Sequence, residues 1–249
     1  MKLTVIGCSG TVPGPDSDAS CYLVEHDGFR LVVDLGHGAL GALQRFVDIA
    51  DIDAVALSHL HTDHWIDLTA LYVAVRYGPY DVRGRIPVFG PPATADSLAD
   101  AYGVGRSPGM HSAFDFQDLS MTTAIGPFQV RATRMAHPIE AYGIRLAAGG
   151  HSLVYSGDTG PCHELVELAS GADLLLAEAS CVDGEPQVPD LHLTGKQAGE
   201  TATEAGVGHL VVTHVPPWNS GAVALAEARS TFTGAISLAA PGWSLELAR

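Results

Sequence analysis

Hydrophobic and polar residues alternate along the first part of the chain in segments that predict short β-strands. Apolar runs at residues 3–7, 21–25 and 29–33 have the length and composition of strands. Asp27-Gly28 stands between the second and third runs, and this dipeptide favours a tight hairpin turn. The chain is therefore expected to begin with a strand followed by a β-hairpin.

Strands and amphipathic helices then alternate through the rest of the chain. The clearest helix is marked by Leu68, Leu71, Tyr72 and Val75, which recur at the spacing of one helical face. The other expected elements are helices at 38–47, 93–102 and 194–205, a final helix after 213, and strands at 54–57, 86–90, 128–133, 143–146, 153–155, 173–177 and 210–213. Hairpins in each half followed by β-α alternation predict an α/β fold, a four-layer αββα sandwich of two facing sheets with helices outside.

Residues 103–119 interrupt this alternation. Their composition turns to Gly, Pro, Ser and Met with two phenylalanines, which is typical of a mobile surface loop. The segment is expected to act as a lid, or to contribute to the substrate rim or to a dimer contact.

Length and apolar content limit the class of protein. The 249 residues fit one domain spanning 1–249, since no linker-like stretch divides them. No apolar run approaches the roughly 20 residues that cross a bilayer, so no membrane association is expected. The strand-like start leaves no room for a signal peptide, which predicts a cytoplasmic location. The four cysteines form no Cys-x-x-Cys pair, so they indicate neither a zinc knuckle nor a disulfide framework.

The charge balance is strongly acidic. The 13 Lys and Arg residues stand against 28 Asp and Glu residues, giving a formal net charge of −15. Such a surface repels a polyphosphate backbone, so nucleic acid is an unlikely partner. A divalent cation site remains compatible with this charge, because bound metals reverse the local electrostatics of a pocket. A small anionic substrate is therefore not excluded.

The stretch "SHLHTDHWID" at residues 58–67 concentrates candidate metal ligands. His59 and His61 are two residues apart, so in an extended segment their imidazoles point to the same side and can share one ion. Asp63 and His64 follow where the chain should turn into a helix near Trp65, and they can serve a second ion. Imidazole with carboxylate suits zinc, manganese or iron. The alternative is a helix N-terminus capped by Asp63, with incidental histidines.

Three more polar residues count against that alternative. His137, Asp158 and His214 each follow an apolar strand-like run, in "MAH", "LVYSGD" and "LVVTH". An α/β fold brings residues at the ends of several strands to one edge of its sheets. These side chains are therefore expected to converge with the histidine-rich loop.

At this point the sequence resembles the metallo-β-lactamase superfamily, and more closely its ribonuclease Z-like phosphodiesterase branch. "SHLHTDH" is similar to the family motif H-x-H-x-D-H, and "VVDLGHG" supplies an upstream aspartate, Asp34. "AHP", "YSGDT" and "VVTHVPP" follow in family order and supply the later ligands. Five motifs in this order, spread over nearly the whole chain, make the resemblance specific.

The resemblance implies a ligand set for two divalent metal ions, with zinc expected first and manganese or iron as alternatives. The implied ligands are His59, His61 and His137 for one ion, Asp63, His64 and His214 for the other, and Asp158 as the bridge between them. Asp34 would orient the ligand loop from behind. The resemblance also implies a homodimer.

Catalytic roles follow from the same resemblance. "LHLTGKQ" resembles the H-x-T helix of the branch, which makes His192 the candidate proton donor to the leaving oxygen. Glu178 in "AEAS" would polarise His192, or is a buried structural carboxylate. Asp63 would accept the proton of the attacking water while remaining a ligand. Two close cations lower the pKa of a shared water, so that hydroxide attacks phosphorus near neutral pH.

The expected substrate is a small phosphodiester. Ribonuclease Z carries a long arm that grips transfer RNA, but only residues 138–157 separate His137 from Asp158 here, which leaves no room for it. Together with the acidic charge, this makes the sequence similar to atypical class II-like cyclic-nucleotide phosphodiesterases of bacteria. Hydrolysis of 3′,5′-cyclic AMP is therefore the expected activity.

Several alternatives stay open on the sequence. A ribonuclease Z-like tRNA 3′ endonuclease and an arylsulfatase-like hydrolase share nearly all the motifs, whereas a lactamase or glyoxalase-type thioesterase does not explain the H-x-T helix. A catalytically silent metal-binding or nucleotide-sensing protein is the alternative of another class. Arg76, Tyr77 and Arg106 are candidate phosphate contacts, although exposed or structural roles are favoured.

Overall fold

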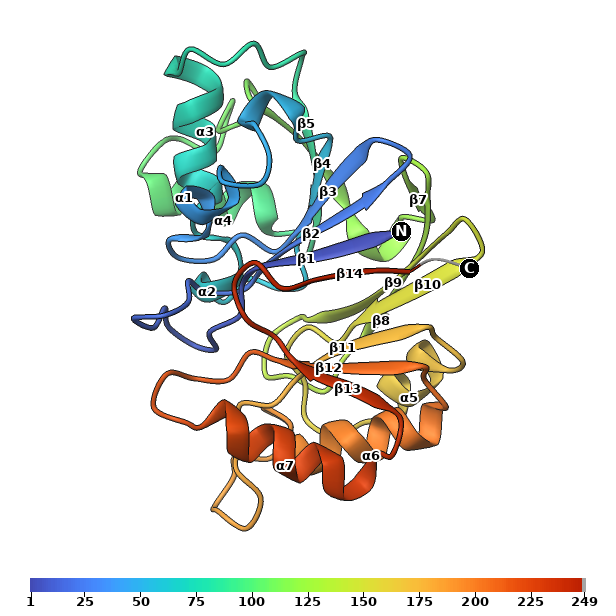
Figure 1. Cartoon of the computed structure of the whole chain (residues 1–249). Coiled ribbons are helices and arrows are strands. Elements are labelled where there is room, and N and C mark those ends of the chain that lie inside the picture. The colour runs from blue at the N-terminus through green and yellow to red at the C-terminus, as the bar shows by residue number, and fades with distance from the viewer. Residues whose placement is uncertain (248–249) are drawn as a thin grey trace.

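The computed structural model describes residues 1–247, and within them two sheets of seven strands face each other (Figure 1). In order across the first sheet, the strands are β14 (Ser244–Glu246), β1 (Lys2–Gly7), β2 (Cys21–His26), β3 (Phe29–Val33), β4 (Ala54–Ala56), β5 (Ile86–Gly90) and β6 (Phe114–Asp118). The second sheet contains β13 (Ala235–Leu238), β12 (His209–Thr213), β11 (Leu174–Glu178), β10 (His151–Tyr155), β9 (Tyr142–Ala148), β8 (Phe128–Arg134) and β7 (Ala124–Ile125).

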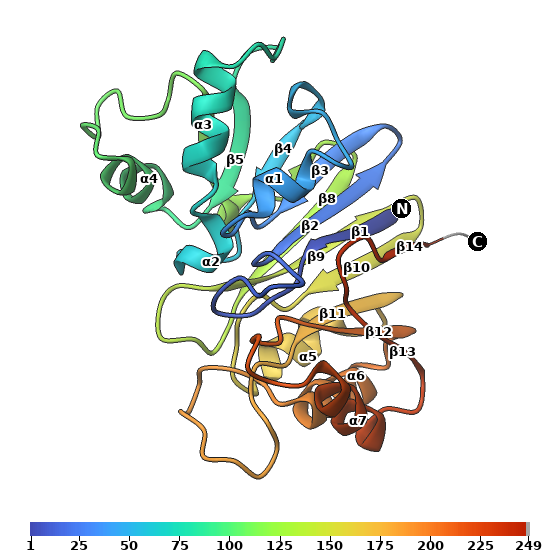
Figure 2. The same ribbon diagram turned by 60° about the vertical axis from the view of Figure 1, so that its left-hand side comes forward.

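Helices cover the outer face of each sheet, at the top and the bottom of Figures 1 and 2. The first sheet carries α1 (Ala39–Leu43), α3 (Leu68–Tyr77) and α4 (Thr94–Tyr102), and the second carries α5 (His163–Ala169), α6 (Gly195–Ala205) and α7 (Gly221–Thr231). The single-turn helix α2 (Thr62–Trp65) and two 3₁₀ turns, Ile49–Asp51 and Leu119–Met121, lie in connections. This arrangement is the expected αββα sandwich.

Each sheet combines an antiparallel part with a parallel part. In the first sheet β1, β2 and β3 are antiparallel neighbours, whereas β3, β4, β5 and β6 run parallel. In the second sheet β8, β9 and β10 are antiparallel neighbours, whereas β10, β11, β12 and β13 run parallel. The carboxyl ends of parallel strands meet at one edge, which is where side chains from distant parts of a sequence can converge.

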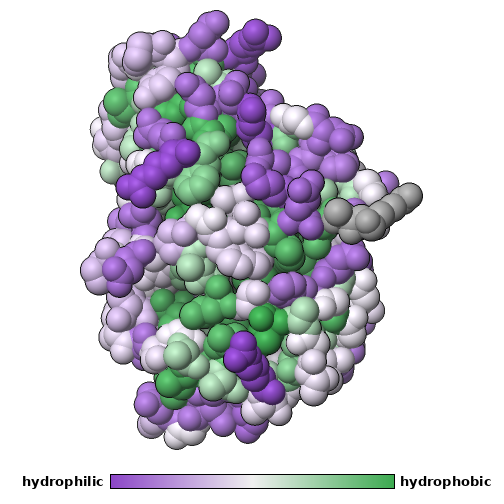
Figure 3. Space-filling model, in the orientation of Figure 1, coloured by the Kyte–Doolittle hydropathy of each residue, from purple (hydrophilic) through white to green (hydrophobic). Residues whose placement is uncertain are grey.

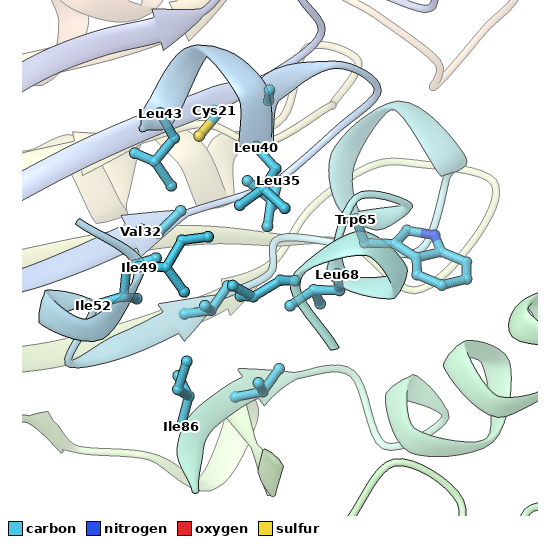
Figure 4. Packing of buried hydrophobic residues seen from close by; sticks show 14 of the residues in the cluster. Cys21, Val32, Leu35, Leu40, Leu43, Ile49, Ile52, Trp65, Leu68 and Ile86 are labelled. Carbon is cyan, nitrogen blue, oxygen red and sulfur yellow. The ribbon is translucent and has the colours of Figure 1, made fainter. Parts of the chain in front are cut away.

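Apolar side chains fill three layers between these elements. Tyr22, Phe128 and Tyr155 lie between the two sheets, and each is almost fully buried. A second cluster lies between the first sheet and its helices (Figure 4), and a third lies under α5, α6 and α7. Burial of one large aliphatic side chain contributes about 1.5–3 kcal/mol, so the strands are fixed by many such contributions.

The turn that carries the histidine-rich motif is anchored to this core. Trp65, at the end of α2, is buried at the margin of the cluster in Figure 4, near Leu68. The backbone N–H of Leu35 donates to the carbonyl of His64, and the N–H of Asp67 donates to the carbonyl of Leu35. Helix α2 begins at Thr62, so Asp63 and His64 lie inside its single turn rather than before a helix that starts near Trp65.

The expectation for residues 103–119 is wrong in its second half. Residues 114–118 form β6, which pairs with β5 in parallel register. Met110, Phe114 and Leu119 are fully buried. The alternation of Phe114 and Phe116 with polar residues is a strand pattern, but the Gly- and Pro-rich stretch before it obscures this pattern. A mobile lid over the whole segment is therefore excluded.

Two other expectations need correction. The helix expected at 38–47 is only α1, Ala39–Leu43, with turns after it. The sequence patterns also missed β13 and β14, and β14 pairs with β1 from the other end of the chain. Strands of only four and three residues depend on a distant partner rather than on local pattern.

No helix among residues 1–247 has the length and apolar content needed to cross a membrane. Figure 3 shows hydrophilic and hydrophobic side chains interspersed over this face of the molecule, with hydrophilic ones at its upper edge. The expected dimer and the expected single domain stay predictions, and residues 248–249 of that domain lie outside the described residues.

Candidate metal centre

The expected ligands meet at the carboxyl ends of strands from both sheets. His59 follows β4, and His137 follows β8. Asp158 follows β10, and His214 comes directly after β12. The backbone of His59 also forms an antiparallel bridge with Ala141, so the two sheets are joined at this edge. Residues up to 155 positions apart in the sequence (His59 to His214) thus converge on one site.

Three histidines form one ligand group, here called cluster one: His59, His61 and His137. The Nε2 atom of His59 lies 3.2 Å from Nδ1 of His61, and Nε2 of His137 lies 3.1 Å from the same Nδ1. Together with a carboxylate oxygen of Asp158, these nitrogens lie within 4.8 Å of one another. Such convergence of imidazole nitrogens without a protein donor between them suits a divalent cation.

Cluster two consists of Asp63, His64 and His214. The Nε2 atoms of His64 and His214 are 3.1 Å apart, and Oδ2 of Asp63 lies 3.4 Å and 3.2 Å from them, respectively. These atoms and Asp158 also lie within 4.8 Å of one another. Cluster two therefore offers two imidazoles and one carboxylate of its own.

Asp158 lies between the two clusters and faces both. Its Oδ2 atom is 3.7 Å from Nε2 of His59, and its Oδ1 atom is 3.3 Å and 3.5 Å from Nε2 of His64 and of His214. The side chain is 2% exposed, and Oδ1 has no hydrogen-bond partner among residues 1–247. A buried carboxylate oxygen without a donor is costly. A cation between the clusters would satisfy it, so the residues present fit a pair of divalent ions.

Outer hydrogen bonds turn two of the ligand imidazoles inward. Nδ1 of His64 lies 2.7 Å from Oδ2 of buried Asp34, and Nδ1 of His137 lies 3.0 Å from the carbonyl oxygen of Leu191. Both partners are acceptors, so each Nδ1 donates its proton and each Nε2 keeps its lone pair toward the cluster. Asp34 adopts a φ of 55°, a left-handed conformation that places its carboxylate behind the loop.

The two clusters differ in protonation. In cluster one, burial lowers the pKa of His59, His61 and His137, and this outweighs the attraction of Asp158. In cluster two, burial opposes ionisation of Asp63, but its contacts with His214 and His64 outweigh burial and hold the pKa of its carboxyl well below its ordinary value. Burial also lowers the pKa of His64, but the charges of Asp158 and Asp34 outweigh it and raise this pKa well above its ordinary value. A metal ion in cluster two would therefore displace a proton from His64. Neutral imidazoles and ionised carboxylates are the forms that bind metal.

His192 and Glu178 form a pair beside the clusters. Nδ1 of His192 donates to Oε1 of Glu178 at 2.9 Å, and Glu178 is fully buried. Backbone N–H groups of Thr159 and Ser180 also donate to this carboxylate. Burial lowers the pKa of His192, but the charge and hydrogen bond of Glu178 outweigh it and raise this pKa to about 9. This shift favours the protonated form of His192 at neutral pH, and its role as proton donor stays a prediction.

The H-x-T sequence has a local structural reason. Thr194 caps α6, because its hydroxyl accepts from the N–H of Gln197 while the Gln197 side chain accepts from the N–H of Thr194. This capping box fixes where the helix begins. His192 lies two residues before the cap, so its backbone position is set by the helix start.

An open pocket of about 460 Å³ lies over the ligands. Its lining residues are Thr11, Leu60, His61, Thr62, Asp63, Asp158, Leu191 and His192. The volume lies within the roughly 300–1,000 Å³ of small-molecule sites. Residues of both clusters and His192 therefore face the same space.

The other sequence candidates lie away from this pocket. Arg106 forms ion pairs with Asp96 and Asp100 on the surface. Arg76 and Tyr77 are exposed at the end of α3, and neither lines the pocket. The structure thus favours the structural or exposed roles for these three residues.

Sequence reasoning missed two buried serines, Ser58 and Ser180, and the hydroxyl of Tyr155, which donates to Asp34 at 2.9 Å. Ser58 adjoins ligand His59, and Ser180 lies two residues after Glu178. The only sequence signal was proximity, of Ser58 to the ligand His59 and of Ser180 to Glu178. Serine beside a site residue has many other roles in proteins.

Comparison with known proteins agrees with this geometry. Residues 30–215 match the family model of the Beta-lactamase superfamily domain. An uncharacterized protein of Mycobacterium tuberculosis, Rv1339, is 44% identical over 243 residues, which cover 95% of this chain and 88% of that protein. Ribonuclease Z of Mycobacterium bovis is 31% identical over 243 residues, covering 87% of this chain and 86% of the enzyme.

A solved structure extends the comparison to three dimensions. The probable metallo-hydrolase YhfI of Bacillus subtilis is 31% identical over 248 residues, covering 99% of this chain and 100% of that protein. Its crystal structure superposes with a TM-score of 0.88, covering 98% of this chain and 99% of that chain, at 28% identity. The protein is thus a metal-dependent hydrolase that belongs to the metallo-β-lactamase superfamily, in its ribonuclease Z-like branch.

Proposed function

We propose that the protein is a dinuclear metal-dependent phosphodiesterase that hydrolyses a small phosphodiester, with 3′,5′-cyclic AMP as its preferred substrate. One observation carries the proposal: two ligand clusters that share Asp158 open into the same pocket as His192. Such a site combines ligands for two cations, which would activate water, with a proton donor for the leaving oxygen. Hydrolysis of a phosphodiester uses both.

Seven residues would hold the ions, with Asp158 between cluster one and cluster two. When bound, two such cations lower the pKa of water and neutralise the non-bridging oxygens of a phosphodiester. The chain itself favours the metal-binding form of the cluster-one ligands, because burial lowers the pKa of His59, His61 and His137. In cluster two, Asp34 accepts from Nδ1 of His64, so that Nε2 of this ring faces the cluster. The imidazole-rich ligand set favours zinc, with manganese or iron as alternatives.

His192 would protonate the leaving oxygen. Its Nδ1 is used by Glu178, so Nε2 remains for the pocket that the ring lines. Attack of water on phosphorus breaks the bond to the 3′ oxygen, and His192 gives its Nε2 proton to that oxygen. Proton transfer of this kind contributes roughly 10²–10⁴-fold to the rate. Glu178 is then a positioning residue that keeps His192 protonated.

Asp63 is a ligand first and a proton acceptor second. Its contacts with His214 and His64 outweigh burial and lower the pKa of its carboxyl, which makes it a weak base. Asp63 lines the pocket, where it would be near the attacking water. A base this weak would accept the proton of that water only if bound cations had strongly lowered the pKa of the water. This role stays a prediction.

The choice of a small diester is supported by size and charge. The pocket of about 460 Å³ suits a nucleotide-sized ligand. Residues 138–157, where an RNA-gripping arm would be inserted, contain the β9–β10 hairpin and its short connections. The formal net charge of −15 opposes binding of a long polyanion.

Transfer RNA processing is the second candidate function, because Ribonuclease Z of Mycobacterium bovis is 31% identical to this chain over 243 residues. The missing arm and the acidic surface make it less favoured than hydrolysis of a small diester.

A substrate panel tests the proposal. Purified protein loaded with Zn²⁺ or Mn²⁺ would be assayed with 3′,5′-cyclic AMP, bis(p-nitrophenyl) phosphate, a sulfate ester, a precursor transfer RNA and a β-lactam. We expect turnover of cyclic AMP to 5′-AMP and of the chromogenic diester. Turnover of the RNA alone, or of the sulfate ester alone, would contradict the proposal.

A further inference from the structure

Ser58 connects a ligand of cluster one to the buried carboxylate of Asp34. Its backbone N–H donates to Oδ1 of Asp34 at 2.7 Å, and its hydroxyl donates to Oδ2 at 2.7 Å. The hydroxyl has only one proton, which is used in that bond. Nδ1 of His59 lies 3.0 Å from the same Oγ, so it must be the donor in this contact. His59 is thereby held as the Nδ1–H tautomer, with the lone pair of Nε2 facing cluster one.

Ser180 makes the corresponding connection in cluster two. Its backbone N–H donates to Oε2 of Glu178 at 3.2 Å, and its hydroxyl donates to the carbonyl oxygen of His214 at 2.8 Å. Nδ1 of His214 lies 2.8 Å from this hydroxyl oxygen and must donate to it. His214 has a φ of 54°, a left-handed conformation that is uncommon for a residue other than glycine. Ser180 therefore contacts both the ring and the backbone of a ligand in a strained conformation.

We propose that Ser58 and Ser180 are positioning residues, each of which fixes the tautomer and direction of one metal ligand: Ser58 for cluster one and Ser180 for cluster two. Both are buried, with Ser58 fully covered and Ser180 5% exposed. The inference rests on the proposed function to the extent that the two clusters bind divalent ions. What is new is that one serine orients a ligand of each ion.

The two serines have different connections beyond their ligands. Asp34 accepts directly from His64 of cluster two and, through Ser58, supports His59 of cluster one. Removal of the Ser58 hydroxyl leaves the contact between Asp34 and His64 in place. Cluster one is therefore expected to weaken selectively.

The Ser180 backbone donates to Glu178, and Glu178 holds His192. Replacement by alanine keeps this backbone contact and removes only the hydroxyl. Loss of the Ser180 hydroxyl is therefore expected to weaken cluster two without displacing the proton donor.

Ser152 provides a matched control. It lies near the start of β10, whereas the ligand Asp158 follows the end of this strand. Its N–H donates to Oδ2 of Asp173 at 2.7 Å, and its hydroxyl donates to the same oxygen at 3.3 Å. It is 7% exposed, and none of its hydrogen-bond partners among the described residues belongs to either ligand cluster. Ser152→Ala thus removes a buried hydroxyl and its carboxylate contact without touching a ligand.

The test compares Ser58→Ala, Ser180→Ala and Ser152→Ala in the full chain. Chelator-stripped proteins would be titrated with Zn²⁺, and zinc per chain would be counted by mass spectrometry after gel filtration. Loss of an outer partner typically weakens metal binding 10–100-fold. We expect Ser58→Ala and Ser180→Ala each to keep one tight ion and to bind the other 10–100-fold more weakly. Ser152→Ala should bind both ions as the wild type does.

Anomalous diffraction at the zinc edge assigns the weakened site. Zinc should be depleted from cluster one in Ser58→Ala and from cluster two in Ser180→Ala. Loss of the same ion in both variants, or wild-type affinity for two ions in both, would overturn the inference and leave the proposed function standing. A wild-type chain that binds no zinc would overturn both proposals.

The tautomers can also be tested in the wild-type protein, which avoids any dependence on the folding of a variant. Nitrogen-15 NMR of the zinc-loaded protein distinguishes the two imidazole tautomers. We expect the Nδ1–H form for His59 and for His214. The Nε2–H form at either residue would overturn the role assigned to its serine.

Discussion

Cluster one and cluster two lie side by side but have different chemical character. Cluster one consists of three imidazoles whose pKa values are lowered by burial. Cluster two contains Asp63, whose ionised form is held by its two histidine neighbours. The first group therefore contributes no charge of its own. The second contains an ionised carboxylate beside His64, whose pKa is lowered by burial but raised overall by the charges of Asp158 and Asp34. Asp158 is the one carboxylate grouped with the three histidines of cluster one, so we expect metal binding there to depend on it.

The difference also bears on metal preference. Three imidazoles and one shared carboxylate form a set that zinc favours. We expect the additional carboxylate to make cluster two more tolerant of harder ions such as Mn²⁺. The outer contacts differ as well, because Asp34 holds His64 directly but reaches His59 only through Ser58. One fold thus supports two neighbouring sites through unequal connections.

The largest effect is expected from Asp158→Ala, which removes the group common to both clusters. The affinity for each of the two ions should fall by more than roughly 100-fold, which is the upper end of the range for losing a residue that only orients a ligand. Activity should fall to background. Zinc counting and cyclic AMP turnover would measure the two losses. Full retention of one ion would show that Asp158 serves a single cluster and would break the comparison.

His137→Ala and His214→Ala form a matched pair, because each removes one imidazole from one cluster. Each variant should keep one ion and lose most of the activity. Anomalous diffraction should find the remaining zinc in the intact cluster. Retention of two tightly bound ions in either variant would remove that histidine from the ligand set.

His192→Ala tests the proton donor separately from the metals. Turnover of cyclic AMP should fall by about 10²–10⁴-fold in kcat, with zinc content unchanged. Bis(p-nitrophenyl) phosphate should be affected much less, because its nitrophenolate leaves without protonation. An equal loss on both substrates would indicate that His192 does not act as the general acid.

Glu178→Gln is expected to move the alkaline limb of the pH profile. His192 must carry its proton to act, and the charge of Glu178 outweighs burial to raise the pKa of His192 to about 9. Activity that depends on this proton is present below that pKa and is lost as pH rises through it. Bound cations lower the value, so the limb should lie at or below about pH 9.

Without the Glu178 charge, burial lowers the pKa of His192 and the limb shifts to lower pH. Rate measurements across the alkaline range, with NMR titration of His192 in the metal-free protein, would check the shift. An unchanged limb in Glu178→Gln would exclude Glu178 from this role.

The smallest effect is expected from Arg106→Ala. Arg106 is engaged with Asp96 and Asp100 on the surface, away from the pocket. Neither kcat nor KM for cyclic AMP should change measurably. A large rise in KM would show that residues near α4 reach the substrate.

Local pattern predicted the elements that carry the ligands. The apolar run at 54–57 and the helical stripe from Leu68 to Val75 are strong signals, and both lie at the elements that flank the histidine motif. Strand β14 could not be predicted in this way, because its three residues depend on pairing with β1 across the whole chain. Composition misled at Phe114, where a strand that begins with this buried side chain follows a Gly-rich turn.

The site was predictable in its ligands but not in its supports. His59, His137, Asp158 and His214 follow apolar strands, and their convergence follows from the edge of an α/β sheet. The contact of Ser58 with Asp34 spans 24 residues and has no periodic signal. Hydrogen bonds of this kind depend on side-chain geometry that only the assembled fold provides.

A crystal structure of the zinc-loaded protein with anomalous data at the zinc edge would decide whether Asp158 joins two metal sites. We predict two zinc peaks per chain, one in cluster one and one in cluster two, with Asp158 bound to both. A single peak, or zinc bound away from Asp158, would contradict this prediction.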